Sequence, residues 1–122
     1  MATIMVVDDE TVVRRLVTST LERHGYTVLG ARCGERGVEC FREHPDEIQL
    51  VLTDVAMPAM SGPEMVDRIL QEKESVKVLF MTGCSDATVL PDRHRKRFSV
   101  LGKPFTLEAL TQAVRRSLDA SR

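Results

Sequence analysis

The stretch Leu-Val-Leu-Thr-Asp-Val-Ala-Met-Pro, residues 50–58, joins a short apolar run to a polar ending. The run from Leu50 to Leu52 predicts a strand that is buried on both faces, because polar and apolar residues do not alternate in it. The strand ends in Asp54, and the residues that follow do not begin a helix at once. Similar runs lie at Ile4 to Val7 and at Val78 to Met81. Strands of this kind are typical of a parallel sheet that is covered by helices on both sides.

Segments of helical period separate these strands. Apolar residues three or four positions apart predict helices around Val13 to Leu21, Val38 to Phe41, Met65 to Leu70 and Leu107 to Leu118. Two weaker runs, residues 26–29 and 98–101, are expected to be edge strands. A fourth helix is expected to be short or irregular within residues 85–96, because Pro91 breaks or kinks a helix. This alternation of strands and helices predicts an α/β fold with right-handed crossovers.

Length and composition favour a small globular protein. The 122 residues predict one domain, residues 1–122, without an effector or DNA-binding domain. Seventeen basic and eighteen acidic residues leave a net charge of −1, which argues against nucleic-acid binding through bulk charge. No apolar run is long enough for a membrane span, and no signal peptide is recognisable. Three cysteines without CxxC spacing argue against disulfides and zinc, so we expect a cytoplasmic protein.

Polar residues stand where four of the five expected strands end. The first strand ends in Asp8 and Asp9, the third in Asp54 and the fourth in Thr82, while Lys103 follows the fifth. Ligands of open parallel sheets bind beyond the carboxyl ends of the strands, so these side chains are expected to converge. Three carboxylates close together repel one another unless a cation is present. Mg²⁺ prefers oxygen ligands, so the sequence predicts a magnesium site at this edge.

Asp54 is the candidate nucleophile of this predicted site. A carboxylate can attack phosphorus and form an acyl phosphate. Phosphoryl transfer requires mainly positioning and charge neutralisation, which Mg²⁺ and Lys103 would supply. The Thr82 hydroxyl can donate a hydrogen bond to a phosphoryl oxygen, and Gly83 beside it leaves room for that group.

Four motifs in register resemble the receiver domains of two-component response regulators. They are Val-Val-Asp-Asp-Glu at residues 6–10, Leu-Thr-Asp-Val-Ala-Met-Pro at 52–58 with Ser-Gly at 61–62, Met-Thr-Gly at 81–83 and Gly-Lys-Pro-Phe at 102–105. Their order and spacing extend the resemblance over essentially the whole chain. Gly-Pro-Glu-Met and Met-Thr-Gly-Cys-Ser-Asp look most similar to receivers of hybrid sensor histidine kinases.

The resemblance implies a flavodoxin-like, doubly wound sheet of five parallel strands in the order 2-1-3-4-5, with five helices. It implies that Asp54 accepts a phosphoryl group from a phosphohistidine of a histidine kinase or a histidine phosphotransfer protein. It also implies that Asp9, Asp54 and the backbone carbonyl of Ala56 bind Mg²⁺ directly, and that Asp8 acts through water. Such a domain catalyses only its own phosphorylation and dephosphorylation, so it is not an enzyme with an external substrate.

Val100 departs from the family pattern. Receivers often have Tyr or Phe at this position. In those proteins the aromatic ring moves inward when the hydroxyl residue that corresponds to Thr82 moves toward the phosphoryl group. Phe98 is expected on the same side of the strand but further from the site. The resemblance also leads us to expect a weak homodimer through the face that carries Val100 and the fourth helix. Ala56 and Cys84 occupy the positions that border the hydrolytic water in receivers and position water poorly, which predicts a long-lived phosphoryl group.

Other interpretations remain open at this point. A pseudo-receiver, a binding module of the same fold that is not phosphorylated, is the alternative that Val100 and the broken fourth helix leave open. An aspartyl phosphatase would require a second Asp two residues after the nucleophile, and residue 56 is Ala. The basic run at residues 93–97 is expected to be a solvated loop, and the alternative is docking to an acidic partner surface.

Overall fold

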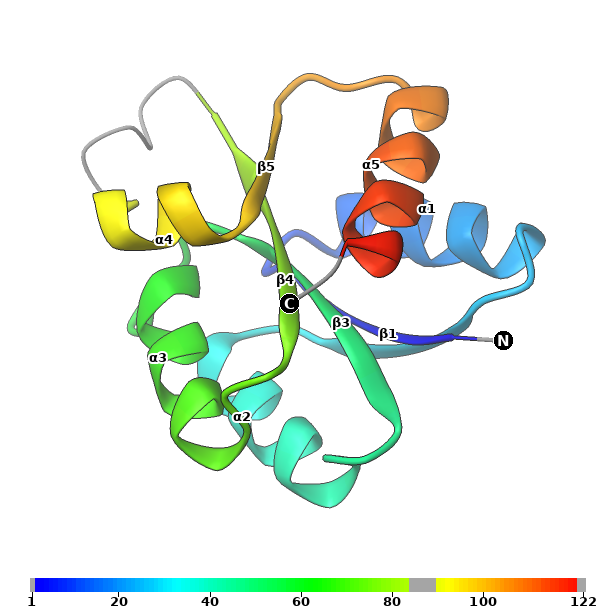
Figure 1. The fold of residues 1–122 in the computed structure, drawn as a ribbon. Coiled ribbons are helices and arrows are strands. Elements are labelled where there is room, and N and C mark those ends of the chain that lie inside the picture. Colours follow the sequence, from blue (N-terminus) through cyan, green and yellow to red (C-terminus); the bar gives the residue numbers. More distant parts are fainter. Residues whose placement is uncertain (1, 84–89, 121–122) are drawn as a thin grey trace.

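The computed structural model describes residues 2–83 and 90–120 (Figure 1). Its elements follow in the order β1 (Thr3–Val7), α1 (Thr11–Arg23), β2 (Thr27–Ala31), α2 (Gly34–Glu43), β3 (Ile48–Asp54), α3 (Gly62–Glu72), β4 (Lys77–Thr82), α4 (Asp92–Arg97), β5 (Ser99–Gly102) and α5 (Leu107–Asp119). The predicted alternation of strands and helices is confirmed. No helix in the described ranges has the length and apolar character needed to cross a membrane.

The strands form one parallel sheet of five strands in the order β2-β1-β3-β4-β5, as expected from the resemblance. The central strands β1, β3 and β4 are almost completely buried, which accounts for their continuous apolar runs. The two weaker runs supply the edge strands β2 and β5, which are more exposed. The sequence therefore predicted both the sheet and its edges.

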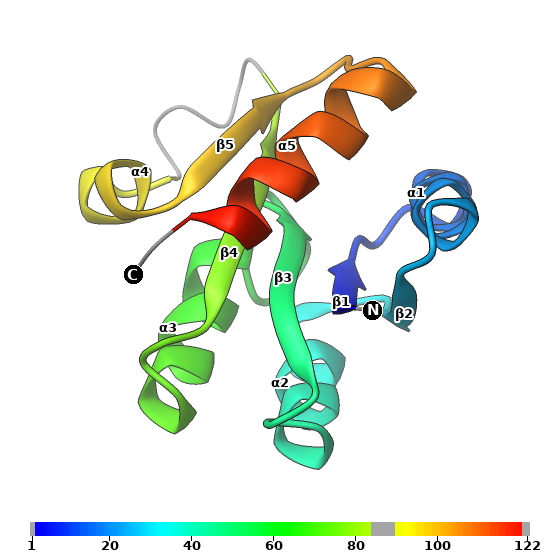
Figure 2. The ribbon, with the colours of Figure 1, turned by 45° about the vertical axis from the view of Figure 1, so that its right-hand side comes forward.

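Helices cover both faces of the sheet and divide the core into two layers. Figures 1 and 2 show α1 and α5 on one side and α2, α3 and α4 on the other. Alternate residues of each strand enter opposite layers, because strand side chains point to the two faces in turn. In β1, Ile4 and Val6 pack with α1 and α5, whereas Met5 and Val7 pack with α2 and α3.

Local signals define several helix ends. Gly25 follows α1 with a φ of 91°, in the left-handed region where glycine is favoured. Thr106 caps α5, since its side chain accepts a hydrogen bond from the amide of Ala109 at 3.0 Å. Ser61 and Glu64 form a reciprocal capping box at the start of α3. These caps fix where α3 and α5 begin beside the ends of β3 and β5.

Helix α4 has only six residues and begins directly after Pro91. The expected short fourth helix is thereby confirmed, although residues 85–89 of the expected segment lie outside the described residues. Phe98 closes α4 by donating its amide to the carbonyl of His94 at 2.8 Å, so β5 begins one residue later than expected. The Phe98 side chain is 7% exposed in the core, whereas Val100 is 42% exposed on the edge strand.

Candidate functional site

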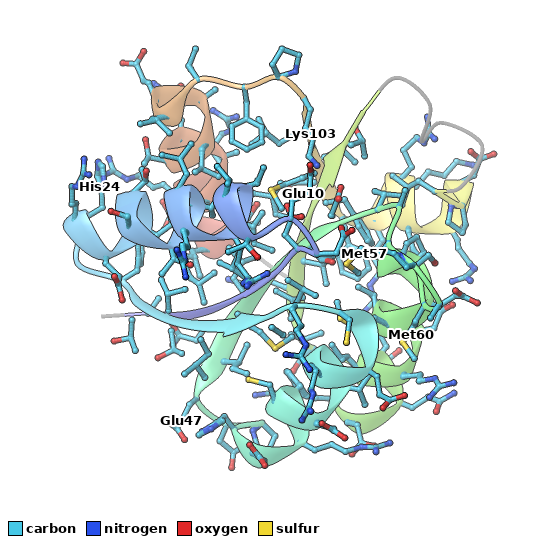
Figure 3. The ribbon with its side chains drawn as sticks, turned by 180° about the vertical axis from the view of Figure 1, so that it is seen from behind. Glu10, His24, Glu47, Met57, Met60 and Lys103 are labelled. Atoms are coloured by element: carbon cyan, nitrogen blue, oxygen red, sulfur yellow. The ribbon has the colours of Figure 1, made fainter. Side chains whose placement is uncertain are left out.

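The carboxyl ends of the strands bring the expected polar residues to one edge of the sheet. Asp54 is the last residue of β3 and pairs in register with Met81, and Thr82 ends β4. Asp8 directly follows β1, and Lys103 directly follows β5. Figure 3 labels Lys103 and Glu10, which lie close to one another toward the upper end of the sheet in that view.

Three carboxylates meet there. Asp8, Glu10 and Asp54 each offer an oxygen within 4.8 Å of the others. Asp8 is 0% exposed and Asp54 is 6% exposed, whereas Glu10 lies at the surface. Burial is the largest cause that raises the pKa of Asp8, and the charge of Asp54 adds to it, so that this pKa is about 6. Ionising the whole cluster at neutral pH is therefore costly without a cation.

Glu10 belongs to this cluster although the sequence did not single it out. Its amide donates to Oδ1 of Asp8 at 2.9 Å, which closes a turn and brings the Glu10 carboxylate over the site. Asp9 is exposed, and its carboxylate is not in the cluster that the described residues form. A side-chain bond from an Asp to the amide two residues later is a common turn, and that signal could have indicated Glu10. The direct metal contact of Asp9 stays a prediction.

Lys103 provides the positive charge of the site. Its Nζ donates to Oδ1 of Asp54 at 2.9 Å. Burial lowers the pKa of Lys103, but the hydrogen bond that Lys103 donates to Asp54 and the charges of Asp54, Asp8 and Glu10 outweigh it, so the pKa is raised. The Lys103 amide donates to the carbonyl of Thr82 at 2.7 Å, and the peptide bond to Pro104 is cis.

Hydrogen bonds to neighbouring residues hold the turn that follows Asp54. The Thr53 hydroxyl donates to the carbonyl of Asp54 at 2.9 Å, and the Val55 amide donates to Oδ1 of Asp54 at 3.0 Å. The amide of Gly62, the first residue of α3, donates to the carbonyl of Val55 at 2.8 Å. A Cβ at Gly62 would lie 2.1 Å from the carbonyl oxygen of Asp54, so only glycine fits there. Ala56, the expected carbonyl ligand, lies in this turn and is exposed.

Arg14 supports the other side of the site and was not anticipated from the sequence. Its Nη1 donates to the carbonyl of Asp8 at 2.7 Å, and its amide donates to the carbonyl of Glu10 at 2.9 Å. The turn that carries the two carboxylates is therefore held to α1. No motif marks this arginine, because its contact depends on the angle at which α1 leaves the turn.

Comparison with known proteins decides the family. A model of the response regulator receiver domain matches residues 4–115. The chain belongs to the receiver family. Sensor kinase CckA of Brucella abortus (strain 2308) is 33% identical over 119 residues, which cover 97% of this chain and 13% of the kinase. Response regulator receiver protein CpdR of the same strain is 33% identical over 122 residues, which cover 99% of this chain and 100% of CpdR.

Solved structures agree with this assignment. A response regulator receiver domain protein from Clostridium thermocellum has a TM-score of 0.90 and 28% identity, covering 98% of this chain and 95% of that one. The receiver domain of a hybrid histidine kinase CckA has a TM-score of 0.82 and 26% identity, covering 97% and 100% of the two chains. The chain is thus similar both to a segment of a sensor kinase and to a separate receiver protein, and it is a domain of two-component signalling.

The donor set of this receiver fits a hard divalent cation. All three clustered groups offer carboxylate oxygens, which Mg²⁺ prefers. Oδ2 of Asp8 is buried and has no hydrogen-bond partner among the described residues. A buried oxygen without a partner is costly, and a cation or its water would satisfy it. The site therefore has both the charge and the open acceptor that Mg²⁺ would use.

Replacing Asp8 by Asn is expected to raise the free energy of unfolding without Mg²⁺ at pH 7 by roughly 3 kcal/mol. The Asp8 carboxyl loses its proton near pH 4 in the unfolded chain but near pH 6 in the folded receiver, so its ionisation removes stability as pH rises through this window. The gain in the variant should vanish at about pH 3, below both pKa values, where Asp8 is protonated in the folded and in the unfolded chain. Urea unfolding in EDTA at both pH values measures it, and an equal gain at both would contradict the explanation.

The basic run at residues 93–97 forms α4 and is not the solvated loop that was expected. Arg93 donates to both carboxylate oxygens of Asp67 on α3, at 2.9 and 3.0 Å. Arg97 donates to the carbonyl of Glu74 and lies 5.0 Å from the centre of the Phe98 ring. The run becomes helical because Pro91 precedes it and these contacts hold it against α3. Docking of this run to an acidic partner stays a prediction.

Proposed function

We propose that this receiver accepts a phosphoryl group on Asp54 from a phosphohistidine of a partner histidine kinase or histidine phosphotransfer protein. The observation that carries the proposal is the bond of 2.9 Å from Lys103 to Asp54 inside a cluster of carboxylates. A structural ion pair would not require two further acidic groups beside it. A phosphoacceptor does, because its cation and its lysine must together balance the added charge.

The transfer exchanges one bond to phosphorus for another. An oxygen of the Asp54 carboxylate attacks the phosphorus, the bond from phosphorus to the partner's imidazole nitrogen breaks, and its electron pair returns to the imidazole. Lys103 stays beside the acyl phosphate as its counter-charge, and the Thr82 hydroxyl donates to a phosphoryl oxygen. Two-component partners with a histidine donor fit the similarity to the sensor kinase CckA.

Mg²⁺ would be held by this chain's own oxygens. The resemblance assigns Asp9, Asp54 and the carbonyl of Ala56 to direct contact, and Asp8 to contact through water. The cluster adds Glu10, whose carboxylate lies with those of Asp8 and Asp54. When bound, the ion would neutralise negative charge on the phosphoryl oxygens.

Ala56 and Val100 bear on how long the phosphoryl group lasts and on which surface responds to it. Ala56 is a small exposed residue that cannot position a hydrolytic water, so we propose a long-lived phosphoryl group; Cys84 lies outside the described residues. Val100 cannot supply a mobile ring, and its exposure on the edge strand leaves that face open for a weak homodimer. The whole of residues 1–122 would act as one cytoplasmic receiver domain.

Incubation with acetyl phosphate, with and without Mg²⁺, tests the proposal through the mass of the intact protein. We expect one added phosphoryl group that depends on Mg²⁺ and is absent in Asp54→Asn, because the amide cannot form the acyl phosphate. Asn has nearly the same shape and makes this a matched control. A gain in Asp54→Asn would move the acceptor elsewhere. No gain in the wild type, together with no binding of Mg²⁺, would favour the pseudo-receiver alternative.

A further inference from the structure

A buried histidine on α4 contacts both α3, which begins beside the site, and β4, which ends at the site. His94 lies on α4 and is 2% exposed. Its Nε2 lies 2.8 Å from Oδ1 of Asp67 on α3, and the carbonyl of Pro63 accepts a second hydrogen bond from the ring. The ring also packs on Phe80 of β4, with the ring centres 5.8 Å apart. His94 therefore touches both α3 and β4.

Both of these elements begin or end at the phosphoacceptor. Pro63 directly follows Gly62 in the first turn of α3. The Cα of Gly62 lies so close to the carbonyl oxygen of Asp54 that no side chain fits between them. Phe80 pairs in register with Thr53, one residue before Asp54, and lies two residues before Thr82. Packed main chains transmit small displacements, because protein interiors have little free volume. A shift of the Asp54 backbone must therefore reach Gly62 and Pro63.

Asp67 keeps the histidine in this position. Its two carboxylate oxygens accept hydrogen bonds from the two terminal nitrogens of Arg93, at 2.9 and 3.0 Å. One of these oxygens also contacts His94. The hydrogen bond from Arg93 holds the pKa of Asp67 below its usual value, so the group is ionised at neutral pH. Bidentate contacts between arginine and a carboxylate restrict orientation as well as distance. These contacts of Asp67 with Arg93 and His94 therefore hold α4 against α3 in a defined orientation.

We propose that the link formed by Asp67, Arg93 and His94 transmits the state of Asp54 to α4, with His94 as its positioning residue. This inference rests on the proposed function, since phosphorylation is the event to be transmitted. It assigns the output to α3 and α4, on the side of the sheet where Phe80 and Phe98 pack, and not to an aromatic ring at Val100. The exposed surface of α4 then becomes the surface whose position reports phosphorylation.

Backbone amide spectra of the ¹⁵N-labelled protein test the link. Addition of acetyl phosphate and Mg²⁺ is expected to shift the amide signals of α4 in the wild type. In Asp67→Ala these shifts should fall at least twofold, while phosphoryl uptake by mass changes less than twofold. His94→Phe should behave in the same way, because Phe keeps the packing on Phe80 but loses both polar contacts. Asp67→Asn keeps an acceptor for both partners and should restore part of the response.

Lys96→Ala is the matched control, because it removes an exposed cation of α4 outside the link and should leave the shifts unchanged. Unaltered α4 shifts in both Asp67→Ala and His94→Phe, or a silent α4 in the phosphorylated wild type, would overturn the inference. The same comparison with Mg²⁺ alone keeps the two proposals separate. A protein that takes no phosphoryl group fails the proposed function, whereas the Mg²⁺ shifts still decide whether the link couples the site to α4.

Discussion

Replacing Gly62 by Ala is expected to lower the free energy of unfolding by about 3 kcal/mol, since a group added to a tightly packed position forces backbone shifts. The new Cβ would lie 2.1 Å from the carbonyl oxygen of Asp54 and 3.3 Å from the hydroxyl oxygen of Thr53. The first of these atoms belongs to the main chain of a buried strand and cannot rotate away. Urea unfolding of both proteins measures the loss.

Gly102→Ala is the control for Gly62→Ala. Gly102 also lies beside the site, at the end of β5, but nothing lies within 4 Å of the position that its Cβ would take. We expect a change of less than about 1 kcal/mol for Gly102→Ala, which is ordinary for a surface substitution. Equal losses in the two variants would show that close contact with Asp54 is not the cause. The displaced Asp54 should also slow phosphoryl uptake in Gly62→Ala only.

Replacing Lys103 by Ala is expected to slow phosphoryl uptake from acetyl phosphate about 100-fold, as for loss of other preorganised groups that stabilise developing charge. Lys103 is 2.9 Å from the attacking carboxylate and is held there by the bond of its own amide to Thr82. Without it, the negative charge that arrives with the phosphoryl group meets Asp8, Glu10 and Asp54 without the counter-charge of the Lys103 ammonium group. The rate of mass gain at saturating Mg²⁺ measures the effect.

Two comparisons identify the cause of this loss. Lys73→Ala removes a lysine that donates to the carbonyl of Pro45, and it should keep the wild-type rate. Lys103→Arg keeps the charge but not the compact ammonium group, so its rate should lie between those of the wild type and Lys103→Ala. A wild-type rate in Lys103→Ala would remove the lysine from the proposed mechanism.

Local patterns were sufficient for most of the fold. The unbroken apolar run at Ile4 to Val7 predicted a central strand, because only a strand covered on both faces buries every side chain. Gly25 and Thr106 are residue types that favour a helix end and a helix start, and each is found in that role. Pro91 predicted a short fourth helix, since it lacks the amide that a helix interior requires. In each case the signal and its effect lie within a few residues of one another.

The sequence by itself also determined which residues end the strands, and therefore that Asp8, Asp54, Thr82 and Lys103 share one edge of the sheet. Only the tertiary structure showed that Glu10 joins the carboxylates, that Arg14 holds the turn carrying them, and that Gly62 lies against the carbonyl of Asp54. Likewise, the contact of His94 with Asp67 joins residues 27 positions apart. The physical reason is that periodicity and strand order place the backbone, whereas the direction of a side chain and the space beside it depend on how separate elements pack.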